Sequence, residues 1–202
     1  GVGDGVIREA IVLAYFGKEL GIRASFEKLG EKIEDREEYN KYVNAVQQAF
    51  DVSNDFGAVI RAAKEKGIDG LSHIKMTIGK PIKVMLAQKA KDIEDGFSQV
   101  GKPAQVEYKY DGFRVQVHKS GKDIRLFTRR LEEVTSQFPE VVNYVREHVS
   151  GDDFILDGEV VGYEPKSGKY LPFQNISQRI RRKYDIDKLV KELPVELHLF
   201  DV

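Results

Sequence analysis

The spacing of apolar residues changes near Pro81, and this change limits the possible folds of the chain more than any other feature. From Val6 to Ala63 apolar residues recur at helical spacing, and no alternating stretch interrupts residues 1 to 70. From residue 104 onward apolar and polar residues alternate in several stretches, as they do in strands that bury one face. The sequence therefore predicts a helical region followed by a region that contains a sheet.

Three helices are predicted in the helical region. The third follows Ser53-Asn54-Asp55, whose short polar side chains can accept hydrogen bonds from free backbone amides, and it stops near Gly67. The three apolar stripes consist of Val6, Ile7, Ala10, Ile11, Ala14 and Tyr15; of Tyr39, Tyr42, Val43, Val46, Ala49 and Phe50; and of Val59, Ile60 and Ala63.

A domain boundary is predicted after residue 78, because the composition shifts there and Pro81, which has no amide donor, marks a break. Further on, Pro139 is favoured in the first turn of a helix. The order of elements is typical of a helical bundle joined to an α+β domain with a largely antiparallel sheet. We predict strands over residues 104–109, 113–118, 124–127, 154–163 and 195–202, and helices over 89–96, 139–148, 173–183 and 186–193.

Lys109 ends the first predicted strand on the same face as Glu107, and Asp111-Gly112 then turns the chain into the next strand. Aspartate bonds its own backbone in turns, and glycine accepts a positive φ. Arg114 follows on the polar face of the next strand. Taken alone, a Lys-x-Asp-Gly-x-Arg string is short enough to arise by chance, and an exposed hairpin with ordinary surface charges explains it as well.

The triplet Asp157-Gly158-Glu159 interrupts an otherwise apolar strand. Two carboxylates and a glycine weaken a buried strand unless something binds them, and the two carboxylates share a face. The triplet therefore indicates a binding site, although the tip of a hairpin would have a similar composition.

Phe200 falls on the polar side of the last predicted strand, opposite the apolar row of Val195, Leu197 and Leu199. An aromatic ring in that position needs a partner. A nucleotide base is one candidate, since base stacking on an aromatic side chain is worth about 1–3 kcal/mol. Packing against another layer of the protein is the other.

Composition excludes several kinds of site. The chain has no cysteine, so disulfides, thiolate zinc sites and cysteine nucleophiles are excluded. Its 32 Lys and Arg against 33 Asp and Glu leave a net charge of -1, which gives no overall attraction to nucleic acid. The sequence contains neither an apolar run of about 18 residues nor a signal peptide, so we expect an intracellular protein outside the membrane.

Four strings, in this order, resemble motifs of the covalent nucleotidyltransferases, and specifically of archaeal-type ATP-dependent DNA ligases. The segment Ile82 to Ala87 is similar to the one that opens the catalytic domain of those ligases. The second of these strings departs from the family at Glu133, where archaeal ligases often have Asn. The strings are Glu107 to Arg114, Thr128-Arg129-Arg130-Leu131-Glu132-Glu133-Val134-Thr135, Asp157-Gly158-Glu159 and Leu199-Phe200-Asp201-Val202.

The resemblance implies a role for each residue of the first string. Lys109 would attack the α-phosphate of ATP and hold AMP as a phosphoramidate. Glu107 would lie at or near the adenine, and Arg114 would contact the ribose or the 5′-phosphate of a nick. A lysine attacks phosphorus only as the neutral amine, so its surroundings would have to favour loss of the proton.

The later strings would complete the nucleotide site. Arg129 corresponds to the basic residue of the second motif. Glu159 would bond the ribose hydroxyl and lie near a catalytic Mg²⁺, a cation that is commonly held by one or two carboxylates together with phosphate oxygens. Phe200 would stack on the base. The basic residues from Arg179 to Lys183 either contact DNA phosphates or form a solvated face.

The resemblance also implies the domain organisation and the partners. Residues 1–78 would be the C-terminal part of a helical DNA-binding domain, and residues 79–202 the N-terminal part of an adenylation domain, a nucleotidyltransferase (ATP-grasp-like) fold. The expected substrate is nicked double-stranded DNA in replication, repair and recombination, with a sliding clamp as a further candidate partner of a monomeric protein. Because the later motifs and the OB-fold domain are absent, we expect no nick sealing by this fragment.

Two other functions fit the same residues. A messenger-RNA capping enzyme or an RNA ligase would use the same lysine, although the helical region favours a DNA ligase. A non-catalytic DNA-binding fragment would keep the fold and lose the nucleotide site. An NAD-dependent ligase is disfavoured, because the chain has no cysteines to bind zinc and no nicotinamide-binding domain precedes the catalytic region.

Overall fold

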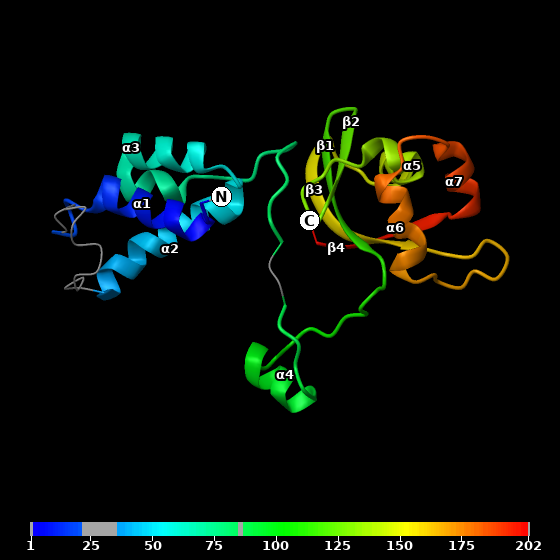
Figure 1. The fold of residues 1–202 in the computed structure, drawn as a ribbon, viewed down its shortest axis with the longest axis horizontal. Helices are drawn as coiled ribbons and strands as arrows, with labels where there is room; N and C mark the ends of the chain where they lie inside the picture. Colours follow the sequence, from blue (N-terminus) through cyan, green and yellow to red (C-terminus); the bar gives the residue numbers. More distant parts are fainter. Residues whose placement is uncertain (1, 22–35, 85–86, 202) are drawn as a thin grey trace. The chain divides into compact units, whose positions relative to one another are not determined.

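The computed structural model describes residues 2–21, 36–84 and 87–201. It divides into two compact units, Gly1–Ile82 and Lys83–Val202 (Figure 1). Each unit has its own hydrophobic core. The sequence places the boundary after residue 78, close to this division. Met85 and Leu86 of the segment Ile82 to Ala87 lie outside the described residues.

The described residues of the first unit form three α-helices where the sequence predicts them. They are α1 (Asp4–Phe16), α2 (Arg36–Ser53) and α3 (Phe56–Ser72). The apolar stripe of α1 is rotated from the predicted one, since Val6 is exposed and Val12 and Phe16 are buried instead. The core of the unit is formed by Ile11, Val12, Phe16, Val46, Ala49, Phe50, Val59, Ala63 and Leu71.

Helix α3 begins at the predicted cap. The Asp55 carboxylate accepts a hydrogen bond from the Ala58 amide at 3.0 Å and lies 2.9 Å from the Lys80 ammonium. The hydrogen bond from Lys80, followed by the one from Ala58, lowers the pKa of Asp55 below its ordinary value of 3.8. At Gly67 the backbone leaves helical geometry with φ at 61°, a conformation that suits glycine, and a short helical stretch then continues to Ser72.

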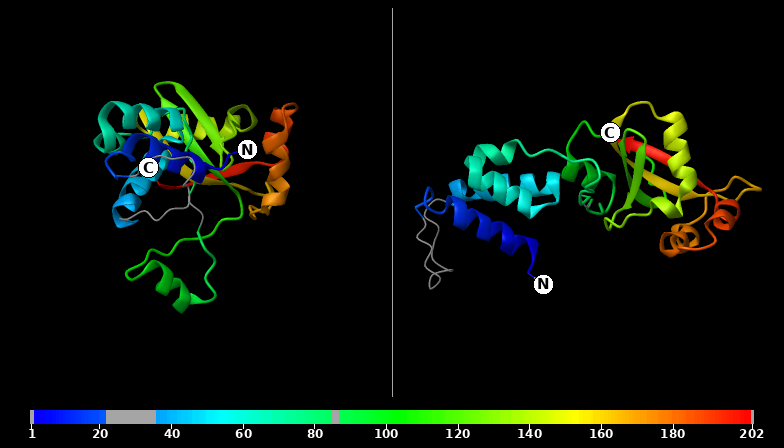
Figure 2. Two further views of the ribbon diagram at one scale, coloured as in Figure 1. Left: turned by 60° about the vertical axis from the view of Figure 1, so that its left-hand side comes forward. Right: turned by 90° about the horizontal axis from the view of Figure 1, so that it is seen from above.

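The second unit is built on one antiparallel sheet with the strand order β2-β1-β3-β4 (Figure 2). β1 and β2 form the predicted hairpin, and β3 contains the Asp-Gly-Glu triplet. The helical first unit and this sheet confirm the predicted succession of an α region and an α+β region. The strands are β1 (Phe113–Ser120), β2 (Asp123–Thr128), β3 (Asp153–Gly162) and β4 (Val195–Asp201).

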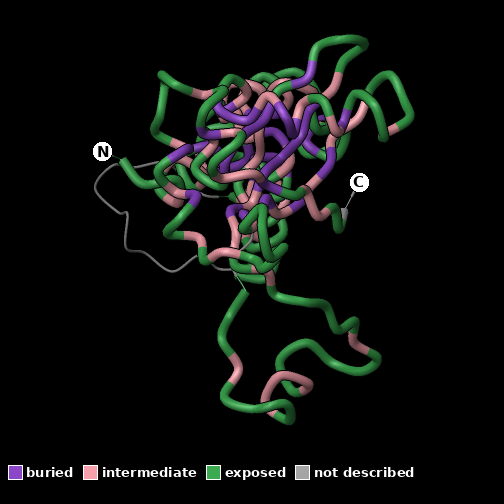
Figure 3. Tube along the Cα trace, turned by 90° about the vertical axis from the view of Figure 1, so that its right-hand side faces the viewer, coloured by how far each residue is buried: buried purple, intermediate pink, exposed green. Residues whose placement is uncertain are grey.

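The helices of the second unit also follow the predictions, with one shift. α4 forms over Ile93–Val100 rather than 89–96, because the Asp92 side chain caps it by accepting from the Asp95 amide at 2.8 Å. α4 buries none of its residues (Figure 3). The remaining helical elements are a 3₁₀ turn at Thr135–Gln137, α5 (Pro139–His148), α6 (Phe173–Arg181) and α7 (Ile186–Glu192).

The strand predicted over residues 104–109 does not form, and this corrects the sequence analysis. The last pair of the β1–β3 ladder is Phe113 with Val160. Residues 105–109 are exposed and belong to no strand. A strand persists only where its backbone groups find a neighbouring strand, so the alternating pattern alone was insufficient here.

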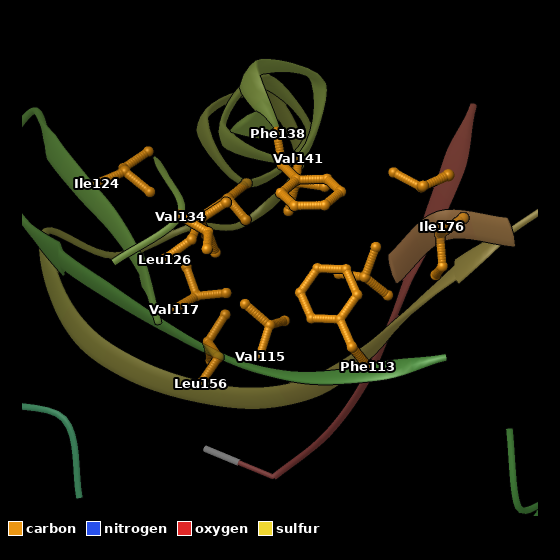
Figure 4. Close-up of a cluster of buried hydrophobic side chains, with 13 residues drawn as sticks. Phe113, Val115, Val117, Ile124, Leu126, Val134, Phe138, Val141, Leu156 and Ile176 are labelled. Atoms are coloured by element: carbon orange, nitrogen blue, oxygen red, sulfur yellow. The ribbon is translucent and has the colours of Figure 1, made fainter. Parts of the chain in front are cut away.

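One face of the sheet packs against α5 and α6 (Figure 4). Val115, Val117 and Leu156 point from the sheet toward Phe138 and Val141, which precede and belong to α5. The opposite face is polar in composition, as predicted for alternate residues of β1. It is not solvent-exposed throughout, because Gln116 and His118 are buried. Burial lowers the pKa of His118, whose ring meets Phe127 edge-on with ring centroids 4.9 Å apart.

Arg179 holds α6 in place, although the sequence grouped it with a basic surface. It is fully buried and donates to the carbonyls of Leu193 at 2.8 Å and Gln137 at 2.9 Å. Its Nη1 also lies 2.6 Å from the Glu140 carboxylate, and its guanidinium lies 4.5 Å from the ring centroid of Phe138. Arg179 is therefore a structural residue and is withdrawn from the candidate DNA contacts.

Replacing Arg179 with Met should destabilise the chain by about 3–5 kcal/mol, because Glu140 would be left as a buried charge without its partner. The double variant Arg179→Met with Glu140→Leu should recover most of this loss, since it removes both charges. Chemical denaturation of the second unit, followed by circular dichroism, measures both effects. A double variant as unstable as the single one would show that the two carbonyl contacts of Arg179, rather than its pairing with Glu140, dominate.

Replacing Asp55 with Ala should lower the stability of the first unit by about 1 kcal/mol, since α3 loses its cap. Asp55→Asn should cost less, because asparagine caps helices as well and only the attraction of Lys80 is lost. Thermal unfolding of the helical unit provides the comparison. Equal losses in the two variants would mean that the ion pair with Lys80 outweighs the cap.

Candidate active site

Three polar residues form a row across the sheet, on the face opposite the core. Arg114 on β1 is paired in register with Glu159 on β3, and Glu159 is paired with His198 on β4. Directly opposed residues of neighbouring strands project to the same side. The row therefore places a guanidinium, a carboxylate and an imidazole next to one another.

Arg114 is held by Asp157, which neighbours the row on the same face. Its Nε donates to the two carboxylate oxygens of Asp157 at 2.9 and 3.0 Å, and its Nη2 donates at 2.6 Å. The guanidinium also lies 5.5 Å from the ring centroid of Phe200, within cation–π range. Arg114 thus links the Asp-Gly-Glu strand to the predicted aromatic residue, and its orientation is fixed before any ligand binds.

Glu159 is half-buried, and its surroundings do not fully compensate for the burial of its charge. Burial raises its pKa above the ordinary value of 4.5, and the neighbouring charge of Asp157 acts in the same direction. The charge of Lys109, the hydrogen bond from the Gly112 amide and the charge of Arg114 act against this rise. A half-buried carboxylate that remains short of positive charge is a ready partner for a bound cation or a donating hydroxyl group.

Gly112 lets the Lys109 segment cross close to β3. A Cβ atom at this position would lie 2.2 Å from the carbonyl oxygen of Val160 and 3.0 Å from the side chain of Glu159, so no other residue fits. The Asp-Gly turn predicts a positive φ at this glycine. Its φ is not among the positive ones, and the reason for glycine is the close approach of two backbones.

A turn after β2 presents two arginines. The Thr128 amide donates to the Glu132 carbonyl at 2.9 Å, and the Leu131 amide donates to the Thr128 carbonyl at 2.8 Å. Leu131 has a left-handed φ of 66°, which is uncommon for a residue other than glycine. The tight turn exposes Arg129 and Arg130, so their charges stay available to a ligand.

These elements surround a cleft of about 1220 Å³. Five cationic side chains line it against three carboxylates, which favours an anionic ligand. The cations are Lys109, Arg114, Arg129, Arg130 and Arg181, and the carboxylates are Asp111, Glu132 and Glu159. The remaining lining residues are Val84, Ala87, Gly112, Phe113, Thr128, Phe173, Ser177, Gln178 and Ile180.

Four of the six predicted site residues meet in the cleft, namely Lys109, Arg114, Arg129 and Glu159. Phe200 reaches them only through its contact with Arg114, and 43% of its surface is exposed.

Glu107 is exposed and accepts a hydrogen bond from Gln105 at 2.5 Å, away from the lining residues. Glu133, the residue that departs from the family pattern, is exposed and accepts a hydrogen bond from the Thr135 hydroxyl at 3.0 Å. It does not line the cleft formed by the described residues.

The sequence predicts a basic segment at the end of α6 but does not place its residues in the cleft. Ser177, Gln178 and Arg181 reach it from α6, because Arg179 and Ile176 on the buried side turn the rest of the helix outward. The basic pattern of residues 179–183 was visible, but the sequence could not tell its buried member from its exposed ones. Asp157 was singled out as a carboxylate, and only the structure shows that it serves Arg114.

The described residues contain no group of three or more His, Cys, Asp or Glu side chains able to hold a metal ion. A cation at Glu159 would therefore depend on oxygen atoms of a ligand for most of its coordination. None of the helices in the described part of the chain is long and apolar enough to cross a membrane.

A family model described as "ATP dependent DNA ligase domain" matches residues 84–202. Over all 202 residues the chain is 46% identical to a DNA ligase of Nanoarchaeum equitans and 40% identical to DNA ligase 2 of Methanosarcina acetivorans. It is 48% identical to a DNA ligase of Methanopyrus kandleri over 77% of its length. The chain spans 31%, 31% and 28% of these three relatives, less than a third of each.

The raised pKa of Glu159 predicts a pH-dependent loss of stability. Between pH 4.5 and the raised pKa, the folded chain retains a proton that the unfolded chain has lost, so this group's contribution to stability falls as the pH rises through that window. Glu159→Gln, which does not titrate, should match the parent near pH 4 and melt about 1–4 °C higher at pH 7.

Differential scanning calorimetry from pH 4 to pH 7 tests this expectation, with Glu147→Gln as the control because that carboxylate is exposed. Melting curves of Glu159→Gln that run parallel to those of the parent at every pH would contradict it.

Proposed function

Because this chain belongs to the family of ATP dependent DNA ligase domains, we propose that its cleft binds ATP and that Lys109 becomes adenylated. The observation that supports this proposal is that Lys109 and Glu159 line the same cleft, in which five cationic side chains face three carboxylates. A triphosphate is a polyanion, and the five cationic side chains that line the cleft suit it. The ligase relatives support the choice of a DNA ligase over a capping enzyme or an RNA ligase.

The proposed step is attack by the Lys109 amine on the α-phosphorus of ATP. A P–N bond forms to the lysine, and the bond from the α-phosphorus to the oxygen of the leaving pyrophosphate breaks. The amine must first lose its proton, and the pyrophosphate leaves with additional negative charge. Arg129, Arg130 and Arg181 line the same cleft and are proposed to neutralise that charge, since phosphoryl transfer depends mainly on positioning and electrostatic stabilisation.

The other proposed roles concern the nucleoside and the metal. Arg114, fixed by Asp157, would bond the ribose or a phosphate, and Phe200 beside it would stack on the adenine. Glu159 would accept from a ribose hydroxyl and take part in holding Mg²⁺ together with ATP phosphate oxygens, which fits a carboxylate that burial leaves short of positive charge. Glu107, exposed before Lys109, is proposed to approach the adenine.

We further propose that the full-length protein seals nicks in duplex DNA, acting as a monomer within the cell during replication, repair and recombination. Residues 1–78 would then be the end of its helical DNA-binding domain, and residues 79–202 the beginning of its ATP-grasp-like adenylation domain. Support comes from the relatives, two of which match the helical unit as well as the catalytic one. A sliding clamp remains a proposed partner of the full-length protein.

Incubating the chain with ATP and Mg²⁺ should add the mass of one adenylate to the denatured protein, and peptide mapping should locate it on Lys109. The variant Lys109→Arg should show no adduct, because a guanidinium stays protonated and cannot attack. Lys122→Arg, on the exposed β1–β2 turn, is the matched control and should be adenylated like the parent.

Three outcomes would contradict the proposal: an adduct on a different lysine, an adduct that survives Lys109→Arg, and the complete absence of an adduct in the parent chain. Labelling with GTP in place of ATP separates the two enzyme classes. Equal or stronger labelling by GTP would favour a capping enzyme over a DNA ligase.

A further inference from the structure

Tyr110, the residue that follows Lys109, lies flat against the imidazole of His198. Their ring centroids are 4.1 Å apart and their planes are 18° from parallel, which is a stacked arrangement. Tyr170 meets both rings edge-on, with centroid distances of 6.5 Å to Tyr110 and 5.7 Å to His198. None of these three side chains lines the cleft formed by the described residues.

His198 offers Tyr110 a fixed surface. It is anchored in β4 directly opposite Glu159, so its place relative to that carboxylate is set by the sheet. Its Nε2 lies 3.5 Å from the Glu196 carboxylate, and Glu196 in turn accepts a hydrogen bond from the Tyr170 hydroxyl at 3.0 Å. The imidazole is therefore constrained through the backbone, and its Nε2 faces the Glu196 carboxylate.

The Lys109 segment has few other anchors. Residues 105–109 are exposed and belong to no strand, and Tyr108, on the other side of Lys109, is 88% exposed. Gly112 bonds Glu159 through its amide at one end of the segment. The stack of Tyr110 on His198 is the second point of attachment, and it is the one nearer to the lysine.

We propose that Tyr110 and His198 are positioning residues for Lys109. Their stack holds the backbone between residues 109 and 112 over the sheet, so that the lysine side chain extends into the cleft beside Glu159. This inference rests on the proposed function only for the role of the lysine. The positioning of the Lys109 segment follows from the contacts of Tyr110, and amide exchange measures it independently of adenylation.

A stack that only covered apolar surface would have a different effect from a positioning stack. Loss of general packing would weaken the whole sheet, including the β1 amides of Val115 and Val117. Loss of a positioning contact would release the segment around Lys109 and leave those amides unchanged. Local amide exchange therefore distinguishes the two roles.

Amide hydrogen exchange of the ¹⁵N-labelled chain, followed by NMR, is the first measurement. Tyr110→Ala should accelerate exchange of the Gly112 amide by about 2- to 12-fold, the factor that corresponds to one aromatic pair, with Val115 and Val117 unchanged. Tyr110→Phe keeps the ring and should behave like the parent. Tyr184→Ala, which removes a tyrosine that is 78% exposed, is the control and should leave all three amides unchanged.

A double-mutant cycle tests whether the two rings act together. His198→Ala should accelerate the Gly112 amide as Tyr110→Ala does, and the double variant should add little, because both changes remove the same contact. His198→Phe restores a ring for stacking and should recover most of the protection. Additive effects of the two alanine variants would overturn the proposed pairing.

The second measurement is the rate of adenylation. Tyr110→Ala should lower the maximal rate and leave the KM for ATP unchanged, because the stack places the nucleophile and does not line the nucleotide cleft. If no variant or parent chain forms an adenylate, the proposed function fails while the exchange result still stands. Unchanged Gly112 exchange in Tyr110→Ala, or equal acceleration at Val115 and Val117, would overturn the positioning role itself.

Discussion

The close passage of Gly112 over β3 is the constraint on which the site depends. Because the space at the α-carbon is taken by the Val160 carbonyl, the chain can approach only as glycine, and its amide then reaches Glu159. The approach brings Lys109 into the electrostatic reach of that carboxylate. The pairing of β1 with β3 ends at Phe113, so the segment that carries Lys109 lies outside the sheet.

The same geometry buries Glu159 without fully compensating its charge. Glu159 loses hydration without gaining a full ion pair, while its neighbour Asp157 takes the bidentate contacts of Arg114. One carboxylate of the pair is thus satisfied within the fold, and the other keeps a raised pKa. Such unequal treatment of two similar side chains is typical of binding sites, where stability is given up for function.

Much of this fold could be predicted because periodicity and capping act locally. The bounds of α5, the β1–β2 hairpin, the Asp55 cap and the shared face of Asp157 and Glu159 all follow from residue spacing.

The predictions failed where the structure depends on contacts between segments that are far apart in the sequence. No local pattern reveals that Arg179 meets two carbonyls from outside its own helix, or that Tyr110 finds His198. Residues 104–109 alternate as a strand does but have no neighbouring strand to pair with.

Helix α6 shows how such a site can change without a change of fold. Its inward residues, Ile176 and Arg179, fix the position of the helix, whereas Ser177, Gln178 and Arg181 face the cleft. The two sets share a backbone but have separate tasks, so a substitution in the cleft-facing set alters the cleft without disturbing the buried contacts of the helix. The size and charge of the cleft can therefore be altered from this one helix with little penalty in folding, as long as the buried arginine is retained.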